Sequence, residues 1–265
     1  MYKRGARMKK KGIALVERQY LFPFVLITSL FFLWGFAHAI LDVLNKHFQE
    51  LLTITRTHSA MIQATMYMGY FIMAIPAGLF INRHGYRRGV VLGLLLYGTG
   101  SLLFIPGQYI ASFNMFLFSL FVIGCGLTFL ETAANPYVTE LGARETAASR
   151  LNFAQSFNGL GCIFAPILTG LLLFSDDDKG AGGNVALPYA VMGVVVLLAA
   201  LAFVRVPLPE IPHEEEVDSE GRRVSLWSHK LFVFGLAALF AYEVAEISIN
   251  SFFINYVTEV GWMNA

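Results

Sequence analysis

Seven long apolar blocks alternate with short polar clusters along this chain of 265 residues. Each block approaches the roughly 20 apolar residues that a helix needs to cross a lipid bilayer. The pattern therefore predicts seven membrane-spanning helices, which we place at 21–45, 59–81, 89–107, 113–137, 151–174, 188–206 and 231–257. The fold class that follows is an all-α, polytopic membrane protein.

Polar clusters between the blocks predict where the chain turns. They read "NRHGYRR" (82–88), "TELGARETAAS" (139–149) and "SDDDKGAGGN" (175–184), and a short "PGQ" (106–108) separates the third span from the fourth. Prolines and an acidic run in 207–230 are typical of a linker outside the membrane. We therefore divide the chain into a six-helix unit (1–206), a linker (207–230) and the first helix of a second unit (231–265).

Composition agrees with a membrane protein and adds little chemistry of its own. The chain is 56% hydrophobic and 14% charged, whereas soluble domains carry roughly 25% charged residues. Cys125 and Cys162 both lie in apolar blocks rich in small residues, so we expect them to pack and to form neither a disulfide framework nor a metal site. We expect no cofactor and no nucleic-acid partner.

The placement of basic residues predicts the orientation in the membrane. Of the 19 lysines and arginines, only Lys46, Arg56 and Lys179 fall on one side of the predicted spans, and the remaining sixteen fall on the other. Cytoplasmic loops carry the excess of such residues. The N-terminus and the 207–230 linker are therefore expected in the cytoplasm, and the first apolar block is expected to be a retained span.

Four acidic residues lie inside the apolar blocks, namely Asp42, Glu131, Glu243 and Glu246. An ionised carboxylate at mid-membrane costs roughly 2.5–3.5 kcal/mol on insertion scales, so such residues are candidates for function. Each must be protonated, paired or in contact with water. For Glu131 the alternative is a purely structural pair with an arginine.

Three of these acids occupy equivalent places if the chain is built from three-helix repeats. Asp42 lies in the first span, Glu131 in the fourth and Glu246 in the seventh, each beyond the middle of its helix. In carriers made of such repeats these three helices correspond to one another, and the binding site lies near the middle of the membrane. We therefore predict functional roles for Asp42, Glu131 and Glu246, as groups that take up and release a proton or contact the substrate.

Helical spacing groups further polar and aromatic side chains with the acids. Trp34, His38 and Asp42 are four residues apart and share one face of the first span, an arrangement suited to stacking and hydrogen bonding with a sugar. The alternatives are an interfacial or lipid-facing role for Trp34 and a structural one for His38.

Polar residues in the fourth and fifth spans are the remaining site candidates. Asn135 follows Glu131 by one turn and precedes Pro136, which by itself would only bend the helix. Gln155 and Asn158 are three residues apart in the fifth span. They either face the same cavity or hydrogen-bond between helices.

Four stretches together resemble one known family. They are "FFLWGFAHAILD" (31–42), "GYFIMAIPAGLFINRHGYRRG" (69–89), "GLTFLETAANPYV" (126–138) and "RLNFAQSFNGLG" (150–161). The chain resembles the fucose:proton symporter family of the major facilitator superfamily, with its glucose/galactose and N-acetylglucosamine relatives. In "GLFINRHGYRR" (78–88), Asn82 stands where the superfamily's loop motif usually has an aspartate.

The resemblance implies a twelve-helix alternating-access carrier of the major facilitator type, of which about seven helices are present here. It assigns proton coupling and sugar binding to Asp42 and Glu131. The implied function is proton-coupled symport of a neutral hexose or deoxyhexose into a bacterial cytoplasm through the cell inner membrane. In the glucose and aminosugar branches a glutamate lies at the place of Glu246, where it could support sodium coupling instead.

Two other classes of function remain as rivals at this stage. An intramembrane enzyme would need a nucleophile with its base or metal ligands at helical spacing such as H-E-x-x-H, and the sequence contains neither, so we expect no enzyme. A truncated, inactive membrane fragment is the other. When complete, the carrier is expected to act as a monomer in the bilayer.

Overall fold

The structure, a computed structural model, describes residues 14–51, 55–173, 186–206 and 226–261, in which helices are joined by turns and no strand is present. The long helices are α1 (Leu21–Leu51), α2 (Arg56–His84), α3 (Tyr86–Leu102), α5 (Phe113–Glu140), α6 (Ala147–Leu173), α7 (Ala186–Arg205) and α8 (Lys230–Glu259). Shorter elements are α4 (Phe104–Ile110), η1 (Arg18–Tyr20), η2 (Arg144–Thr146) and η4 (Leu226–Ser228). The predicted all-α class is confirmed.

Six segments of the described residues are long and apolar enough to cross a membrane. They are Arg18–Leu41, His58–His84, Tyr86–Ile110, Phe113–Glu140, Ala186–Arg205 and Lys230–Asn250. The predicted fifth span corresponds to α6, which has 27 residues.

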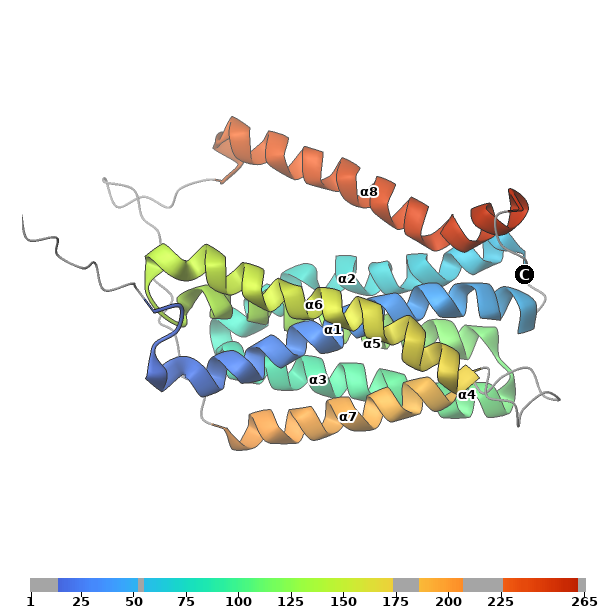
Figure 1. The fold of residues 1–265 in the computed structure, drawn as a ribbon, viewed down its shortest axis with the longest axis horizontal. Helices are drawn as coiled ribbons and strands as arrows, with labels where there is room; N and C mark the ends of the chain where they lie inside the picture. Colours follow the sequence, from blue (N-terminus) through green and yellow to red (C-terminus); the bar gives the residue numbers. More distant parts are fainter. Residues whose placement is uncertain (1–13, 52–54, 174–185, 207–225, 262–265) are drawn as a thin grey trace, which may run out of the picture.

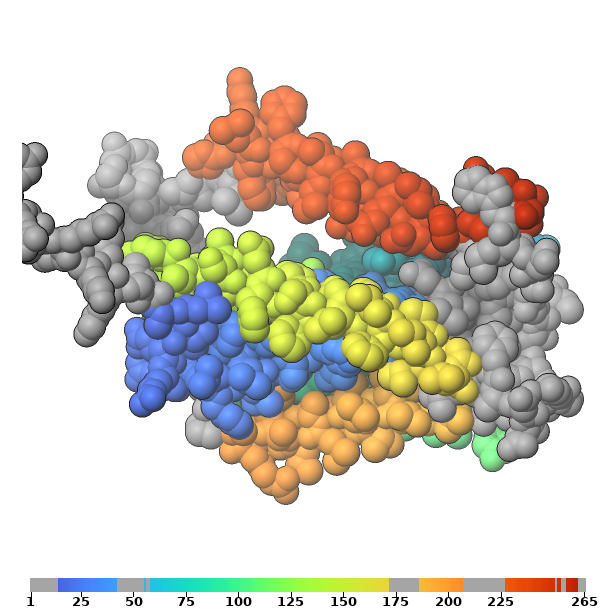
Figure 2. Space-filling model, in the orientation of Figure 1, coloured from blue at the N-terminus to red at the C-terminus, as the bar shows by residue number. Residues whose placement is uncertain are grey.

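The six helices from α1 to α7, with α4 continuing α3, lie side by side in one bundle (Figure 1). α1 packs mainly on α6, α5 packs on both α2 and α3, and α3 packs on α7. Large buried side chains, including Phe31, Tyr97, Tyr137 and Tyr189, fill the space between them. Helix α8 lies apart, on the side of α2 and α6, and its own side chains are mostly exposed (Figures 1 and 2).

Glycines bring the helix backbones into direct contact. A Cβ atom at Gly35 of α1 would overlap with the carbonyl oxygen of Asn158, and one at Gly161 of α6 would overlap with that of Phe32. On the other side of the bundle, a Cβ atom at Gly124 of α5 would overlap with the carbonyl oxygen of Met66. Small residues of this kind let membrane helices approach closely where no hydrophobic force favours their association.

The predicted turn at 106–108 is wrong. Pro106 lies in the first turn of α4, where its missing N–H group has no intrahelical acceptor in any case. The chain turns after α4 instead. Ala111 adopts a left-handed conformation (φ 48°), and the Ser112 hydroxyl then accepts a hydrogen bond from the Met115 N–H at 3.4 Å and caps α5.

The turn predicted at 82–88 is much tighter than expected. Helix α2 continues to His84 and α3 begins at Tyr86, so that one residue, Gly85, separates them. Gly85 has a φ of 85°, a backbone conformation that residues other than glycine rarely adopt. The other predicted boundaries shift by a few residues, as expected for helix ends, and 207–225 of the predicted linker lies outside the described residues.

Two arginines at the same end of the bundle satisfy carbonyl groups at helix C-termini. Arg87 donates to the carbonyl oxygens of Phe203 (3.2 Å) and Val204 in the last turn of α7. Arg150, which the sequence places among the loop charges, is fully buried. It therefore acts inside the bundle.

Candidate functional site

The structure brings three of the predicted site residues together. Trp34 of α1, and Glu131 and Asn135 of α5, line one small cavity, whose remaining walls are Leu30, Phe31, Leu130 and Ala134. The cavity has a volume of about 10 Å³, which is room for one water molecule. The cavity that these described residues line is too small for a sugar ring.

Helical spacing explains why these groups converge. Glu131 and Asn135 are one turn apart on α5, so their side chains lie on the same face, and that face meets the face of α1 that carries Trp34. The carboxyl group of Glu131 is half-buried among apolar side chains. None of the described lysines and arginines forms an ion pair with it, so the predicted alternative of a structural pair has no support here.

Asn135 adds an unsatisfied acceptor to the cavity. Its Oδ1 atom is buried and has no hydrogen-bond partner among the described residues. Leaving such a group unpaired costs about 1–3 kcal/mol, so a water molecule or a ligand hydroxyl that bonds to it would be stabilised. A carboxyl group, a free amide oxygen and an indole face are together suited to a neutral polyhydroxylated molecule.

Trp34 is held by a hydrogen-bonded network that was not predicted from the sequence. The Trp34 indole Nε1–H donates to the Tyr70 hydroxyl at 3.0 Å, and this hydroxyl lies 3.5 Å from His38 Nε2. The His38 ring packs on both Tyr70 and Tyr67, with centroids 5.9 and 6.3 Å away. Both tyrosines come from α2, and their spacing of three residues inside an apolar span was the available signal.

Asp42, the second predicted proton-coupling residue, belongs to α1 one turn beyond His38. Its side chain lies outside the described residues. Its part in coupling therefore stays a prediction.

The polar residues of α6 do not reach the cavity. Asn158 donates from Nδ2 to the carbonyl oxygen of Phe31 at 3.3 Å, and the Cys162 thiol lies 3.5 Å from the carbonyl oxygen of Gly35. Asn158 thus joins α6 to α1, which is the alternative considered for it above. Gln155 is exposed and does not line the cavity.

Helix α8 contributes none of the described residues that line the cavity. Glu246 is exposed and is not among the residues that line it. The predicted meeting of Glu246 with the acids of the other two repeats is thus not seen in this conformation.

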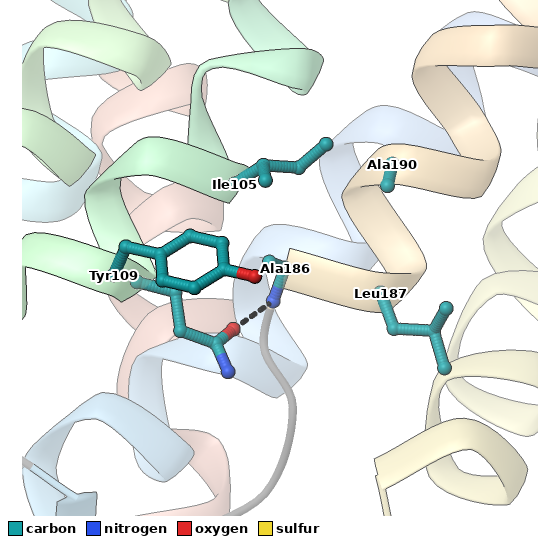
Figure 3. Close-up of a pocket in the computed structure, with 6 residues that line it drawn as sticks. Ile105, Tyr109, Ala186, Leu187 and Ala190 are labelled. Atoms are coloured by element: carbon teal, nitrogen blue, oxygen red, sulfur yellow. Dashed lines mark hydrogen bonds between the residues drawn. The ribbon is translucent and has the colours of Figure 1, made fainter.

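A much larger cavity lies elsewhere, between α4 and α7, and differs in chemistry (Figure 3). It has a volume of about 510 Å³ and is lined by Ile105, Gln108, Tyr109, Ala186, Leu187 and Ala190. The side-chain oxygen of Gln108 already accepts a hydrogen bond from the Ala186 N–H at 2.7 Å, which caps α7. Since none of the described residues that line this cavity is acidic or basic, we place the candidate site at Glu131.

The helical bundle and its buried acid define a polytopic membrane transporter, and comparison with known proteins agrees. The family model "Major Facilitator Superfamily" matches residues 24–264. The chain belongs to this superfamily. Membership in a transporter family also confirms the expectation that the chain is not an enzyme.

Curated relatives narrow the comparison to sugar transporters. The chain is 36% identical over 247 residues to the glucose/galactose transporter of Brucella abortus (strain 2308), covering 92% of this chain and 60% of the relative. It is 35% identical over 267 residues to the L-fucose-proton symporter of Escherichia coli (strain K12), covering 92% and 61%. These matches confirm the resemblance predicted from the sequence. The chain spans less than two thirds of the length of these relatives.

Solved structures show the same fold. The chain matches the crystal structure of the transporter FucP in the outward conformation with a TM-score of 0.62 and 37% identity, covering 72% of this chain and 51% of that one. The inward-open xylose transporter XylE of E. coli matches with a TM-score of 0.59 at 16% identity, a likeness that concerns the fold alone.

Proposed function

We propose that this protein takes part in proton-coupled symport of a neutral hexose or deoxyhexose across a bacterial inner membrane, with its N-terminus in the cytoplasm. The observation that carries this proposal is the cavity in which Glu131 and Trp34 meet beside the unsatisfied oxygen of Asn135. The similarity to sugar transporters supports the substrate class.

Glu131 is the proton acceptor in this proposal. Its carboxyl group is half-buried, has no described cationic partner and lies next to the cavity. Binding of an external proton would remove the cost of a charge inside the membrane and would turn the carboxyl group into a hydrogen-bond donor for a sugar hydroxyl. Asp42 would link protonation to inward opening.

Trp34 and Asn135 would recognise the sugar itself. The indole face offers a flat apolar surface to the C–H groups of a sugar ring, and Asn135 Oδ1 accepts a hydrogen bond from a hydroxyl. Because this cavity has a volume of only about 10 Å³, the helices must separate before a sugar enters. Rocking of helical units around a central site, as in transporters built from repeats, provides such an opening.

The proton supplies the driving force because the substrate is uncharged. Moving one elementary charge across the membrane is worth about 2.3 kcal/mol per 100 mV. A neutral sugar gains nothing from the potential unless a charged ion crosses with it. Coupling through Glu131 would therefore convert the membrane potential into a sugar gradient.

The decisive experiment is the substitution Glu131→Gln, which keeps the shape and removes the exchangeable charge. We expect proteoliposomes with this variant to lose sugar accumulation driven by a proton gradient and to retain counterflow exchange of labelled sugar. Glu140→Gln is the matched control, because Glu140 lies in the same helix and is exposed. Uphill accumulation by Glu131→Gln would contradict the proposal.

The alternative is sodium-coupled uptake of glucose, galactose or N-acetylglucosamine, which the similarity to glucose/galactose transporters favours. Replacing external sodium by choline at constant pH distinguishes the two ions, since only sodium-coupled uptake would stop. A panel of fucose, glucose, galactose and N-acetylglucosamine identifies the sugar. Parallel assays of the chain alone and of the chain continued by the C-terminal helices of a relative show whether it transports by itself.

A further inference from the structure

The contacts of His38 fix the direction of the hydrogen bonds around Tyr70. His38 Nδ1 lies 3.1 Å from the backbone carbonyl oxygen of Trp34. A carbonyl oxygen can only accept, so Nδ1 must carry a proton. In the neutral ring Nε2 is then unprotonated and accepts.

The Tyr70 hydroxyl is therefore used in both directions. It accepts from the Trp34 indole N–H at 3.0 Å, and with a neutral His38 ring it donates to Nε2, 3.5 Å away. This chain of donors runs from α1 to α2 and back to α1, and it ends at the backbone of Trp34 itself. Both the ring and the backbone of Trp34 are thereby held by one phenol and one imidazole.

We infer that Tyr70 is a positioning residue of the sugar site, which acts through Trp34 and touches neither the sugar nor the proton. Trp34 lines the cavity with Glu131, whereas Tyr70 and His38 do not. An indole is held in one orientation when its single polar atom is bonded, and a fixed stacking surface lowers the entropy lost on binding. This inference rests on the proposed function for its effect on sugar affinity, but the hydrogen bond itself is independent of it.

Tyr70→Phe is the test, because it removes the hydroxyl and keeps the aromatic ring. In a background of Trp227→Phe and Trp262→Phe, Trp34 is the one tryptophan left of the three in the sequence. Ultraviolet resonance Raman spectroscopy then reports the strength of the indole N–H hydrogen bond directly. We expect Tyr70→Phe to weaken this signal and to raise the KM for the sugar roughly 3- to 10-fold, the effect of losing one net hydrogen bond.

The maximal rate and the number of protons carried per sugar should change less than twofold, because Glu131 is untouched. Tyr109→Phe is the matched control, since Tyr109 is 89% exposed and remote from Trp34. If Tyr70→Phe does not fold, His38→Phe tests the same network, because it removes the acceptor of the Tyr70 hydroxyl. We then expect a weakened indole signal and a raised KM, and an unchanged signal would overturn the inference. Where Tyr70→Phe does fold, combining it with Trp34→Phe should raise KM no further than Trp34→Phe alone in a counterflow assay.

The outcomes separate this inference from the proposed function. An unchanged indole signal in Tyr70→Phe overturns the inference whatever the transport assays show. A weakened signal with an unchanged KM also overturns it, because the bond then has no effect on the sugar. If instead Glu131→Gln still accumulates sugar while Tyr70→Phe weakens the signal and raises KM, the proton role of Glu131 fails and the positioning role stands.

Discussion

Arg150 shows how one side chain secures a whole connection. Its guanidinium group donates to the carbonyl oxygens of Val138 (3.0 Å) and Thr139 at the end of α5, and to that of Ala143 (3.0 Å) in the connection. It also reaches the Leu15 carbonyl oxygen at 3.2 Å. The last carbonyl groups of a helix have no intrahelical partner, and a buried guanidinium group with five donors satisfies several of them at once.

Replacing Arg150 by alanine should therefore destabilise the protein strongly. Several buried carbonyl groups would lose a charged donor, at a cost of about 1.5–3 kcal/mol for each such bond. We expect the melting temperature in detergent to fall by at least about 10 °C. Arg144→Ala, which changes an exposed arginine of the same connection, should leave it within about 2 °C; equal effects of the two substitutions would contradict this role.

The residues that line the cavity could be predicted from the sequence better than the residues that hold them in place. Glu131 and Asn135 are recognisable because a carboxyl and an amide group one turn apart are costly inside an apolar helix. Tyr70 is not, because a tyrosine in a span is equally compatible with packing, with a lipid headgroup or with a hydrogen bond. Arg150 was counted as a loop charge, since the sequence does not show that α6 begins before it.

At the scale of elements, helices α1 and α6 approach each other so closely that their backbones are in contact. Gly35 and Gly161 each place a helix backbone against the backbone of the other helix. Asn158 and Cys162 add polar contacts to the carbonyl oxygens of Phe31 and Gly35. At these glycines the two helices are thus joined backbone to backbone.

Gly161→Ala should separate the two helices, because the added methyl group would overlap with a carbonyl oxygen that cannot rotate away. Overpacking of this kind costs about 1–3 kcal/mol. Gly159→Ala is the matched control two residues earlier, where a Cβ atom meets nothing within 4 Å. Thermal unfolding in detergent should show a lower melting temperature for Gly161→Ala and an unchanged or higher one for Gly159→Ala; the reverse order would refute this account of the contact.

The presence of each helix could be predicted from the sequence, whereas the residues at which it begins and ends could be predicted less well. Hydrophobic length identifies a span because the bilayer thickness is fixed. The turn predicted at 106–108 was wrong because a proline in a sequence suggests the end of a helix, whereas proline is also tolerated in the first turn of one. The actual turn depends on a left-handed alanine at 111, a residue with no turn preference of its own.

At the scale of the whole molecule, the bundle and α8 differ in how they are held. Helices α1 to α7 bury one another, whereas none of the described span of α8 from Lys230 to Asn250 is buried. The apolar surface of α8 is compatible with lipid or with further helices. Its position relative to the Glu131 cavity could not be derived from periodicity, because repeat equivalence predicts which helices correspond and not how far apart they stand.

The orientation proposed for the molecule can be tested with two single cysteines. Tyr109 and Trp227 are 89% and 72% exposed, and the distribution of basic residues assigns them to opposite sides of the membrane. In a variant without Cys125 and Cys162, we expect a membrane-impermeant maleimide to label Tyr109→Cys in cells with a permeabilised outer membrane. Trp227→Cys should react only after the inner membrane is disrupted, and the opposite pattern would invert the topology.

The contact at Gly161 also limits which substitutions this protein can accept during evolution. Its obstacle is the carbonyl oxygen of Phe32, an atom that every amino acid possesses. A second substitution at position 32 therefore cannot create room for a larger residue at position 161, as it could if two side chains were in conflict. A larger residue at position 161 can therefore be accommodated only if one of the two helices shifts as a whole.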